Sequence, residues 1–150
     1  MVADFRIMAT GSGRVGLPEA RLGMIPALGG TQRLAELVGK SKAIEMMFKG
    51  LQLSAEEAVS IGLVHRVVEE TDLPAASLDF AVRLARQATE ALAHIKRATR
   101  IGLRQGFAAG IAAEQAAFAE NIASHDAREG VRAFLAGEKP RYTGNRKEPS

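Results

Sequence analysis

The sequence predicts an α/β fold with two parts: strands and helices mixed over residues 1–70, followed by a helical segment over residues 71–150. In the first part, short segments of β character alternate with Gly and Pro turn signals. From Pro74 to Gly137 the chain is instead rich in Ala and follows helical periodicity. We therefore expect the boundary between the two parts near residues 69–74.

The first part is predicted to begin with strands and to continue with short helices. Phe5 and Ile7 alternate with a charged residue, which is typical of a half-buried strand. Ser54 and Glu57 have the spacing of a capping box, which predicts a helix start. In chain order, the predicted elements are strands over residues 5–7 and 15–17, helices over residues 31–39, 41–48 and 54–62, and a strand over residues 63–68.

The second part is predicted to contain four helices and an extended tail. Gly106 is an expected C-cap, and Gly102 lies inside a helix, where the missing side chain would allow close packing. The tail from Lys139 to Gly144 should be extended, and residues 145–150 should be loosely held. The predicted helices cover residues 75–88, 90–105, 110–123 and 126–136.

The composition limits the classes of function. Hydrophobic residues make up 47% of the 150 residues and aromatic residues only 5%, so the core must consist of aliphatic side chains and Met. The net charge of +3 suits an anionic ligand but is no footprint of nucleic-acid binding. The absence of Cys excludes disulfides, thiolate metal sites and Cys nucleophiles. The lack of Cys leaves the compartment open, although a reducing cytoplasm fits. No apolar run is long enough for a membrane span, and the N-terminus lacks the layout of a signal peptide.

The segment with the strongest chemical signal is Gly16–Glu19 followed by Gly23–Leu34. It places one carboxylate, that of Glu19, just before a loop rich in Pro and Gly that opens into a helix. Free N–H groups at a helix start, facing a carboxylate, can hold a water molecule and a polarised oxygen. We therefore treat Glu19 as the main catalytic candidate.

This segment resembles the signature of the enoyl-CoA hydratase/isomerase (crotonase) family, in which the second of two catalytic glutamates follows the proline. Three motifs and a strand resemble further landmarks of the family in the expected order. The resemblance covers nearly the whole chain but only the C-terminal half of the family. It implies part of a crotonase-like spiral of ββα units, followed by a C-terminal helical segment that drives oligomerisation. The further matching segments are Ala3–Ile7, Leu53–Ala58, Ile61–Val64 and Asp126–Leu135.

The resemblance also implies a chemistry. Family members bind acyl-CoA thioesters, and two backbone N–H groups polarise the thioester oxygen. In the hydratases, which are lyases of fatty acid metabolism, two glutamates handle the water and the proton, and Glu19 matches the one that activates water. The positions of the first glutamate and of both N–H donors would lie upstream of Met1. The CoA thioester is the substrate, so no separate cofactor and no metal are expected.

The resemblance assigns further residues to the site. Many relatives have Gly at the position of Ala27, where a positive φ would be unfavourable for Ala. Phe118 and Phe134 match aromatic residues that can cover CoA, although Phe118 shares a helical stripe with Ile111 and Ile122 that also fits core packing. Lys139 lies two residues after the position, Gly137, where the family often has a lysine suited to a CoA phosphate. The residues expected to position substrate or water are Leu17, Pro18, Pro26, Ala27 and Gly29.

Other polar residues carry weaker signals. Lys96, Arg100 and Arg104 lie on one helical face, best interpreted as a solvated face. His65, His94 and His125 have no catalytic partner at motif spacing and are expected at the surface or in packing roles.

Two hypotheses about function stay open on the sequence. The first is a 2-enoyl-CoA hydratase whose complete site needs a complementary N-terminal half, in a homo-oligomer such as a trimer or a dimer of trimers. The second is a truncated, non-catalytic fragment that associates or binds acyl-CoA weakly. Isomerase, hydrolase or decarboxylase activity is also compatible, although Glu19 favours hydration. A partial spiral should leave an unpaired strand edge near residues 2–9 and 15–18, which favours self-association. Partners other than acyl-CoA and protein chains, namely nucleic acid or a membrane, are not expected.

Overall fold

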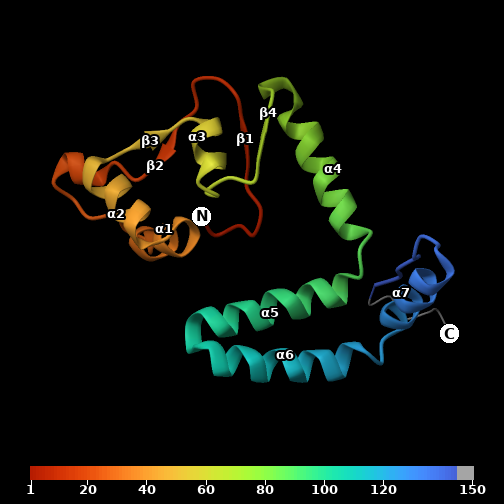
Figure 1. Ribbon diagram of the computed structural model, residues 1–150. Helices are drawn as coiled ribbons and strands as arrows, with labels where there is room; N and C mark the ends of the chain where they lie inside the picture. The colour runs from red at the N-terminus through yellow and green to blue at the C-terminus, as the bar shows by residue number, and fades with distance from the viewer. Residues whose placement is uncertain (145–150) are drawn as a thin grey trace. The chain divides into compact units, whose positions relative to one another are not determined.

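A computed structural model describes residues 1–144 (Figure 1). The contacts within the chain define two compact units, Met1–Leu78 and Asp79–Ser150. The first unit contains strands with short helices, and the second contains the longer helices. The boundary falls within α4 (Leu73–Ala85). The division into domains at residues 70 and 71 stays a prediction.

The first unit contains two small sheets of two strands each. β1 (Ile7–Ala9) pairs in parallel with β4 (Arg66–Val68), and Met8 lies opposite Val67. β2 (Val15–Gly16) pairs antiparallel with β3 (Gln52–Leu53). In the described part of the chain each strand therefore keeps one edge without a strand partner, and the self-association expected from such edges stays a prediction.

The predicted strands are present but shorter or shifted. The first begins at Ile7 rather than Phe5. The last begins at Arg66 rather than Leu63, because Leu63 and Val64 are buried residues of the preceding loop. β3 was not predicted, since two residues are too few to show an alternation.

The three predicted helices of this unit are confirmed within one or two residues at each end. α1 (Gly30–Val38) and α2 (Lys40–Lys49) are separated by Gly39, which has a positive φ of 81°. α3 (Ala55–Ser60) begins with the predicted capping box. The Glu57 N–H donates to Ser54 Oγ at 3.2 Å, and the Ser54 N–H donates to Glu57 Oε2 at 2.7 Å. The capping box satisfies N–H groups that a helix start leaves unpaired.

The core of the first unit is aliphatic and contains methionine, as the composition predicted. Leu34, Met46 and Leu63 are the largest fully buried side chains. Gly16 lies so close to β3 that a Cβ on it would overlap the Leu51 carbonyl oxygen. The other buried members of this core are Ala43, Met47, Leu53, Ala58 and Val64.

The second unit contains a hairpin of two long helices, α5 (Thr89–Gln105) and α6 (Phe107–Asn121), which lie side by side (Figure 1). Gly106 ends α5, as predicted, and its N–H donates to the Gly102 carbonyl. The same glycine is the N-cap of α6, so α6 begins three residues before the predicted start at residue 110. Among residues 1–144, no helix combines the length and the apolar character that a membrane span requires.

The last helix, α7 (His125–Ala136), is followed by a tail that folds back onto it. Ser124 caps the helix through its side chain, which accepts from the Ala127 N–H at 3.1 Å. Gly137 ends the helix with a positive φ of 68°. Residues 138–143 have no helix or strand, and the extended conformation expected for them stays a prediction. Residues 145–150, which we expected to be loose, lie outside the described residues.

Candidate functional site

Glu19 lies in a tight turn between β2 and α1. It is the first residue of the short 3₁₀ helix η1 (Glu19–Leu22), which the sequence did not predict. The Glu19 carbonyl accepts from the Met24 N–H at 3.1 Å, and the Arg21 N–H donates to the Pro18 carbonyl at 2.9 Å. The backbone on both sides of Glu19 is therefore fixed by hydrogen bonds.

The Glu19 carboxylate has an unused acceptor. Its Oε2 atom is buried and has no hydrogen-bond partner among the described residues. A buried carboxylate oxygen without a donor is costly, about 1–3 kcal/mol or more. An arrangement of this kind is suited to a donor that the chain itself does not supply, such as a water molecule or a ligand.

The loop before α1 contains two consecutive residues in the left-handed conformation. Leu28 has a φ of 54° and Gly29 a φ of 77°. The sequence raised the question of a positive φ at Ala27, but Ala27 is not among the positive-φ residues. The unfavourable backbone conformation is found at Leu28 instead. The Gly30 N–H closes the turn by donating to the Ala27 carbonyl at 2.9 Å. The Leu28 side chain is 97% exposed, so packing does not explain its conformation.

Leu17 and Pro26 meet at the start of α1. A Cβ on Gly30 would lie 3.2 Å from Leu17 Cδ1 and 3.2 Å from Pro26 Cβ. Gly30 is buried, so both side chains pack directly on the helix backbone. The structure thus brings these two predicted positioning residues together, whereas Pro18 lies at the N-cap of η1. Their roles toward substrate and water stay predictions.

Arg33, in the first turn of α1, lies next to this loop and has no role in the sequence-based site. Its Nε atom lies 3.2 Å from the position of a Cβ on Gly29, so its side chain folds back over the left-handed turn. Its N–H also donates to the Gly29 carbonyl at 2.9 Å. Arg33 Nε is buried without a partner among residues 1–144. The only feature of the sequence that could have indicated this contact is the position of Arg33 one helical turn after Gly29.

The aromatic residues expected at CoA are exposed in the second unit. Phe118 is 66% exposed and Phe134 is 84% exposed. The alternative that Phe118 packs in a core is therefore wrong for the residues described. Phe118 instead lines an open groove of about 580 Å³ along α5 and α6, together with Ile95, Leu103, Phe107 and Ile111.

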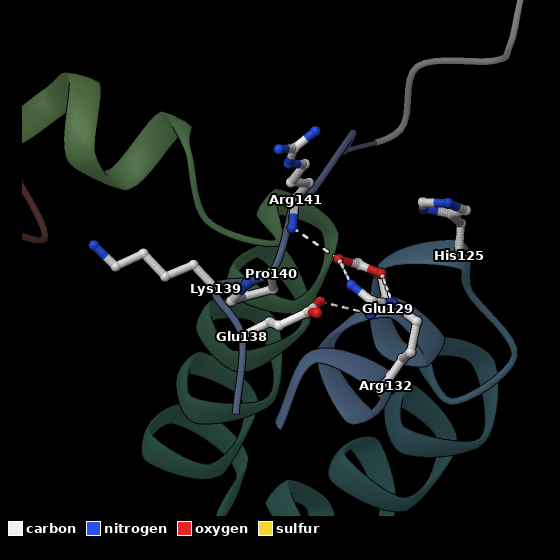
Figure 2. A pocket seen from close by; sticks show the side chains of 7 residues that line it. All are labelled: His125, Glu129, Arg132, Glu138, Lys139, Pro140 and Arg141. Carbon is white, nitrogen blue, oxygen red and sulfur yellow. Dashed lines mark hydrogen bonds and ion pairs between the residues drawn. The ribbon is translucent and has the colours of Figure 1, made fainter. Parts of the chain in front are cut away.

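Lys139 lines a second hollow, of about 760 Å³, formed by α7 and the tail (Figure 2). Here Glu129 accepts from Arg132 Nε at 2.8 Å and from the Arg141 N–H at 3.0 Å. The hydrogen bonds from Arg132 and then from the Arg141 backbone lower the pKa of Glu129 from 4.5 to about 2. Glu129 is therefore ionised at neutral pH, and Arg132 balances its charge.

The histidines have packing and surface roles. The His65 ring packs on Phe5 with the ring centroids 5.3 Å apart. Burial and the nearby charge of Arg6 lower the pKa of His65. His94 lies near Arg97, and His125 near Asp126. In the described part of the chain, no group of three or more His, Cys, Asp or Glu residues could hold a metal ion.

Comparisons with known proteins give one family. The enoyl-CoA hydratase/isomerase family matches residues 1–145. YngF of Bacillus subtilis carries the name of an enoyl-CoA hydratase/isomerase. It is 38% identical to this chain over 144 residues, which cover 96% of this chain and 55% of that protein. The mitochondrial methylglutaconyl-CoA hydratase of Mus musculus is 36% identical over 148 residues, covering 96% of this chain and 47% of that protein.

A solved structure agrees with these relatives. An enoyl-CoA hydratase from Geobacillus kaustophilus superposes with a TM-score of 0.85 at 38% identity, covering 94% of this chain and 53% of that one. The predicted partial crotonase-like fold is thus supported, while the oligomerising role of the helical segment stays a prediction. The chain spans about half the length of the curated relatives it matches. It belongs to the enoyl-CoA hydratase/isomerase family.

Proposed function

We propose that the protein carrying this chain adds water to 2-enoyl-CoA thioesters and that Glu19 is one of its two catalytic carboxylates. The observation that carries this proposal is the buried Glu19 Oε2 atom, which has no partner among the described residues although the surrounding turn is fixed. The hydratases among its relatives and structural neighbours support the same reaction.

The reaction needs a base and an acid. The water oxygen forms a bond to the β-carbon of the enoyl group, and the carbon–carbon π bond breaks. One water proton passes to a carboxylate, and a proton is delivered to the α-carbon, so that the product is a 3-hydroxyacyl-CoA. Glu19 is assigned the water and its proton, since its free oxygen can accept a hydrogen bond from that water.

Glu19 alone does not complete this chemistry. A second carboxylate is needed, and so are two N–H donors for the thioester oxygen, each worth about 3–4 kcal/mol of barrier. Because the chain spans about half the length of its relatives, we assign these groups to residues beyond these 150, on the same polypeptide or on a complementary chain.

The positions of the other residues fit supporting roles. Leu17 and Pro26 pack on Gly30 and would hold the loop that faces the water. The exposed rings of Phe118 and Phe134 and the ammonium of Lys139 are proposed contacts for the CoA moiety. The thioester is itself the substrate, so we propose no further cofactor.

Self-association is part of the proposal. The α5–α6 hairpin exposes large apolar side chains, which is typical of a surface that another chain covers. Phe107 is 83% exposed and Leu103 is 68% exposed. We propose a homo-oligomer, in keeping with the trimer that the family resemblance implies, and light scattering of the purified protein measures its size.

The test is hydration of crotonyl-CoA, followed as loss of the absorbance of the conjugated thioester. Glu19→Gln should slow turnover by about 10²- to 10⁴-fold, whereas Glu36→Gln, at a position of α1 outside the proposed site, should leave it unchanged. Parallel assays with a 3-enoyl-CoA and for release of free CoA thiol detect isomerase or hydrolase activity. Turnover in either of these assays, without hydration of crotonyl-CoA, would refute the proposed hydratase activity and show isomerase or hydrolase activity instead.

A further inference from the structure

The tail of the chain is held on α7 by a buried carboxylate. Asp126, the second residue of α7, is only 4% exposed. Its Oδ1 accepts from the Thr143 N–H at 2.8 Å and from the Thr143 hydroxyl at 3.2 Å. Its Oδ2 accepts from the Gly144 N–H at 2.9 Å. One side chain thus satisfies two backbone donors that lie 17 and 18 residues further along the chain.

Glu129, one turn further along α7, holds the tail at a second point. Its Oε1 accepts from the Arg141 N–H at 3.0 Å and from Arg132 at 3.1 Å. Arg132 extends the network by donating to Glu138 Oε2 at 2.8 Å. Figure 2 shows Arg132 between the two glutamates, with dashed lines to both. Both ends of the segment Glu138–Gly144, which we call the tail segment, are therefore fixed on α7.

Tyr142 fits between these two points because α7 has a glycine there. A Cβ on Gly130 would lie 3.2 Å from the Tyr142 hydroxyl oxygen. The ring therefore approaches the helix where no side chain intervenes. Hydrogen bonds at Arg141 and Thr143, together with this contact, leave the backbone between them little freedom.

Two cationic side chains project from the tail segment without a partner. Lys139 and Arg141 line the hollow at α7, and neither side chain has a hydrogen bond or an ion pair within residues 1–144. In Figure 2 both extend away from the network of Glu129, Arg132 and Glu138. Arg132 forms the ion pairs with both glutamates, and the side chains of Lys139 and Arg141 lie outside this network, so their charges can meet an external anion.

We propose that Asp126 and Glu129 are positioning residues that fix the tail segment so that Lys139 and Arg141 meet the phosphates of the CoA thioester. This inference rests on the proposed function, since it deepens how that substrate is held. Asp126 and Glu129 touch no substrate and act only through the backbone of the tail segment. Their loss should therefore weaken binding of the phosphate-bearing part of the substrate and leave the chemical step intact.

The experiment compares two substrates, crotonyl-CoA and crotonyl-pantetheine, which carries the same thioester without the nucleotide and its phosphates. Asp126→Asn and Glu129→Gln should each raise the KM for crotonyl-CoA by about tenfold, as expected for one lost charged contact. They should leave kcat and the KM for crotonyl-pantetheine unchanged. Asp79→Asn, which removes an exposed carboxylate of α4, is the matched control and should change neither constant.

A double-mutant cycle tests whether Asp126 affects the KM for crotonyl-CoA through Lys139 and Arg141. If Asp126 acts through the cations, Asp126→Asn should add little to the KM of a Lys139→Ala/Arg141→Ala variant. A loss of kcat with both substrates would instead show that Asp126 merely stabilises the fold and would overturn the inference. If Asp126→Asn fails to fold, Glu129→Gln and Thr143→Val, which removes only the hydroxyl donor, give the same comparison.

A binding measurement separates this inference from the proposed function. Titration calorimetry with 3′-phosphoadenosine 5′-diphosphate, the nucleotide part of CoA, needs no turnover. Weaker binding to Asp126→Asn in a protein that hydrates no enoyl-CoA would refute the proposed reaction and keep the positioning role. Unchanged nucleotide binding and an unchanged KM in a protein that does hydrate crotonyl-CoA would refute the positioning role alone.

Discussion

Gly102 on α5 and Gly110 on α6 approach each other so closely that only one of them could carry a side chain. A Cβ on Gly110 would lie 3.3 Å from Gly102 N, a tight contact, and 2.7 Å from Gly102 Cα, which is closer than real Cβ atoms come to backbone. A Cβ on Gly102 would lie 3.4 Å from Gly110 Cα, an ordinary contact. The packing of the hairpin therefore depends more on the glycine at position 110 than on the glycine at position 102.

This asymmetry predicts different effects of the same substitution. Gly110→Ala should lower the free energy of unfolding by about 1–3 kcal/mol, because the two helices must move apart. Gly102→Ala should be close to neutral, because a helical Ala gains about 1 kcal/mol over Gly and offsets a small adjustment. Urea denaturation followed by circular dichroism measures both variants, and equal losses would contradict the contact described.

The backbone of Leu28 should be strained, because its φ of 54° lies in the left-handed region. A left-handed conformation costs a residue other than Gly about 1–2 kcal/mol, while Gly costs about 0.4–1 kcal/mol through the entropy of the unfolded chain. Leu28→Gly should therefore raise the free energy of unfolding slightly. Leu22→Gly removes a similarly exposed leucine without a positive φ and should lower it. A loss of stability in Leu28→Gly would show that the loop is not strained.

The capping box of α3 provides a prediction of a different kind. Ser54→Ala leaves the Glu57 N–H without its acceptor and should cost about 0.5–2 kcal/mol. Ser41→Ala, on the exposed surface of α2, serves as the control and should change the stability by less than about 0.5 kcal/mol. Thermal unfolding measures the stability of both variants, and indistinguishable melting curves would mean that the Ser54 cap contributes nothing to stability.

The docking of the tail on α7 should depend on pH in the acid range. The pKa of Glu129 falls from 4.5 in the unfolded chain to about 2 in the fold, so its contribution is complete above about pH 4.5 and is lost as the pH falls toward 2. Asp126 acts in the same direction: burial opposes its ionisation, but hydrogen bonds from Thr143, His125 and Gly144 outweigh burial and lower its pKa. The charged groups around Glu129 are Arg132 and His125.

Nuclear magnetic resonance can follow this release directly. The amide signal of Arg141, whose N–H donates to Glu129, should shift with a midpoint near pH 2. In Glu129→Gln this transition should disappear. A midpoint at or above pH 4.5 would show that the carboxylate is not held in its ionised form by Arg132 and the tail.

Local patterns in the sequence predicted the helices well because helix starts and ends are chemically marked. Ser54 with Glu57, and the glycines at positions 39, 50 and 106, indicated boundaries that the structure confirms closely. β3 was missed because its two residues contain no periodicity. The sequence raised the question of a positive φ at Ala27, whereas the structure has it at Leu28, since a resemblance to a family does not fix the φ of each loop residue.

Contacts between distant residues were the part that sequence reasoning could not supply. The stripe of Phe118 on α6 was visible, but periodicity indicates which face is apolar and not what covers it. The hydrogen bonds that Thr143 and Gly144 donate to Asp126 leave no local pattern, since they join residues 17 and 18 apart. Glu19 Oε2 and Arg33 Nε are buried without a partner within residues 1–144, and this too became visible only in the folded structure.

The most direct test of the proposed mechanism separates substrate binding from turnover in Glu19→Gln. Calorimetric titration with crotonyl-CoA should give an unchanged Kd, because Gln keeps the shape of the side chain and of the turn around it. Single-turnover hydration under saturating substrate should be slower by about 10²- to 10⁴-fold, as expected when a general base is lost. Hydration at the unmodified rate in Glu19→Gln would contradict the central claim that the free carboxylate oxygen of Glu19 activates the water.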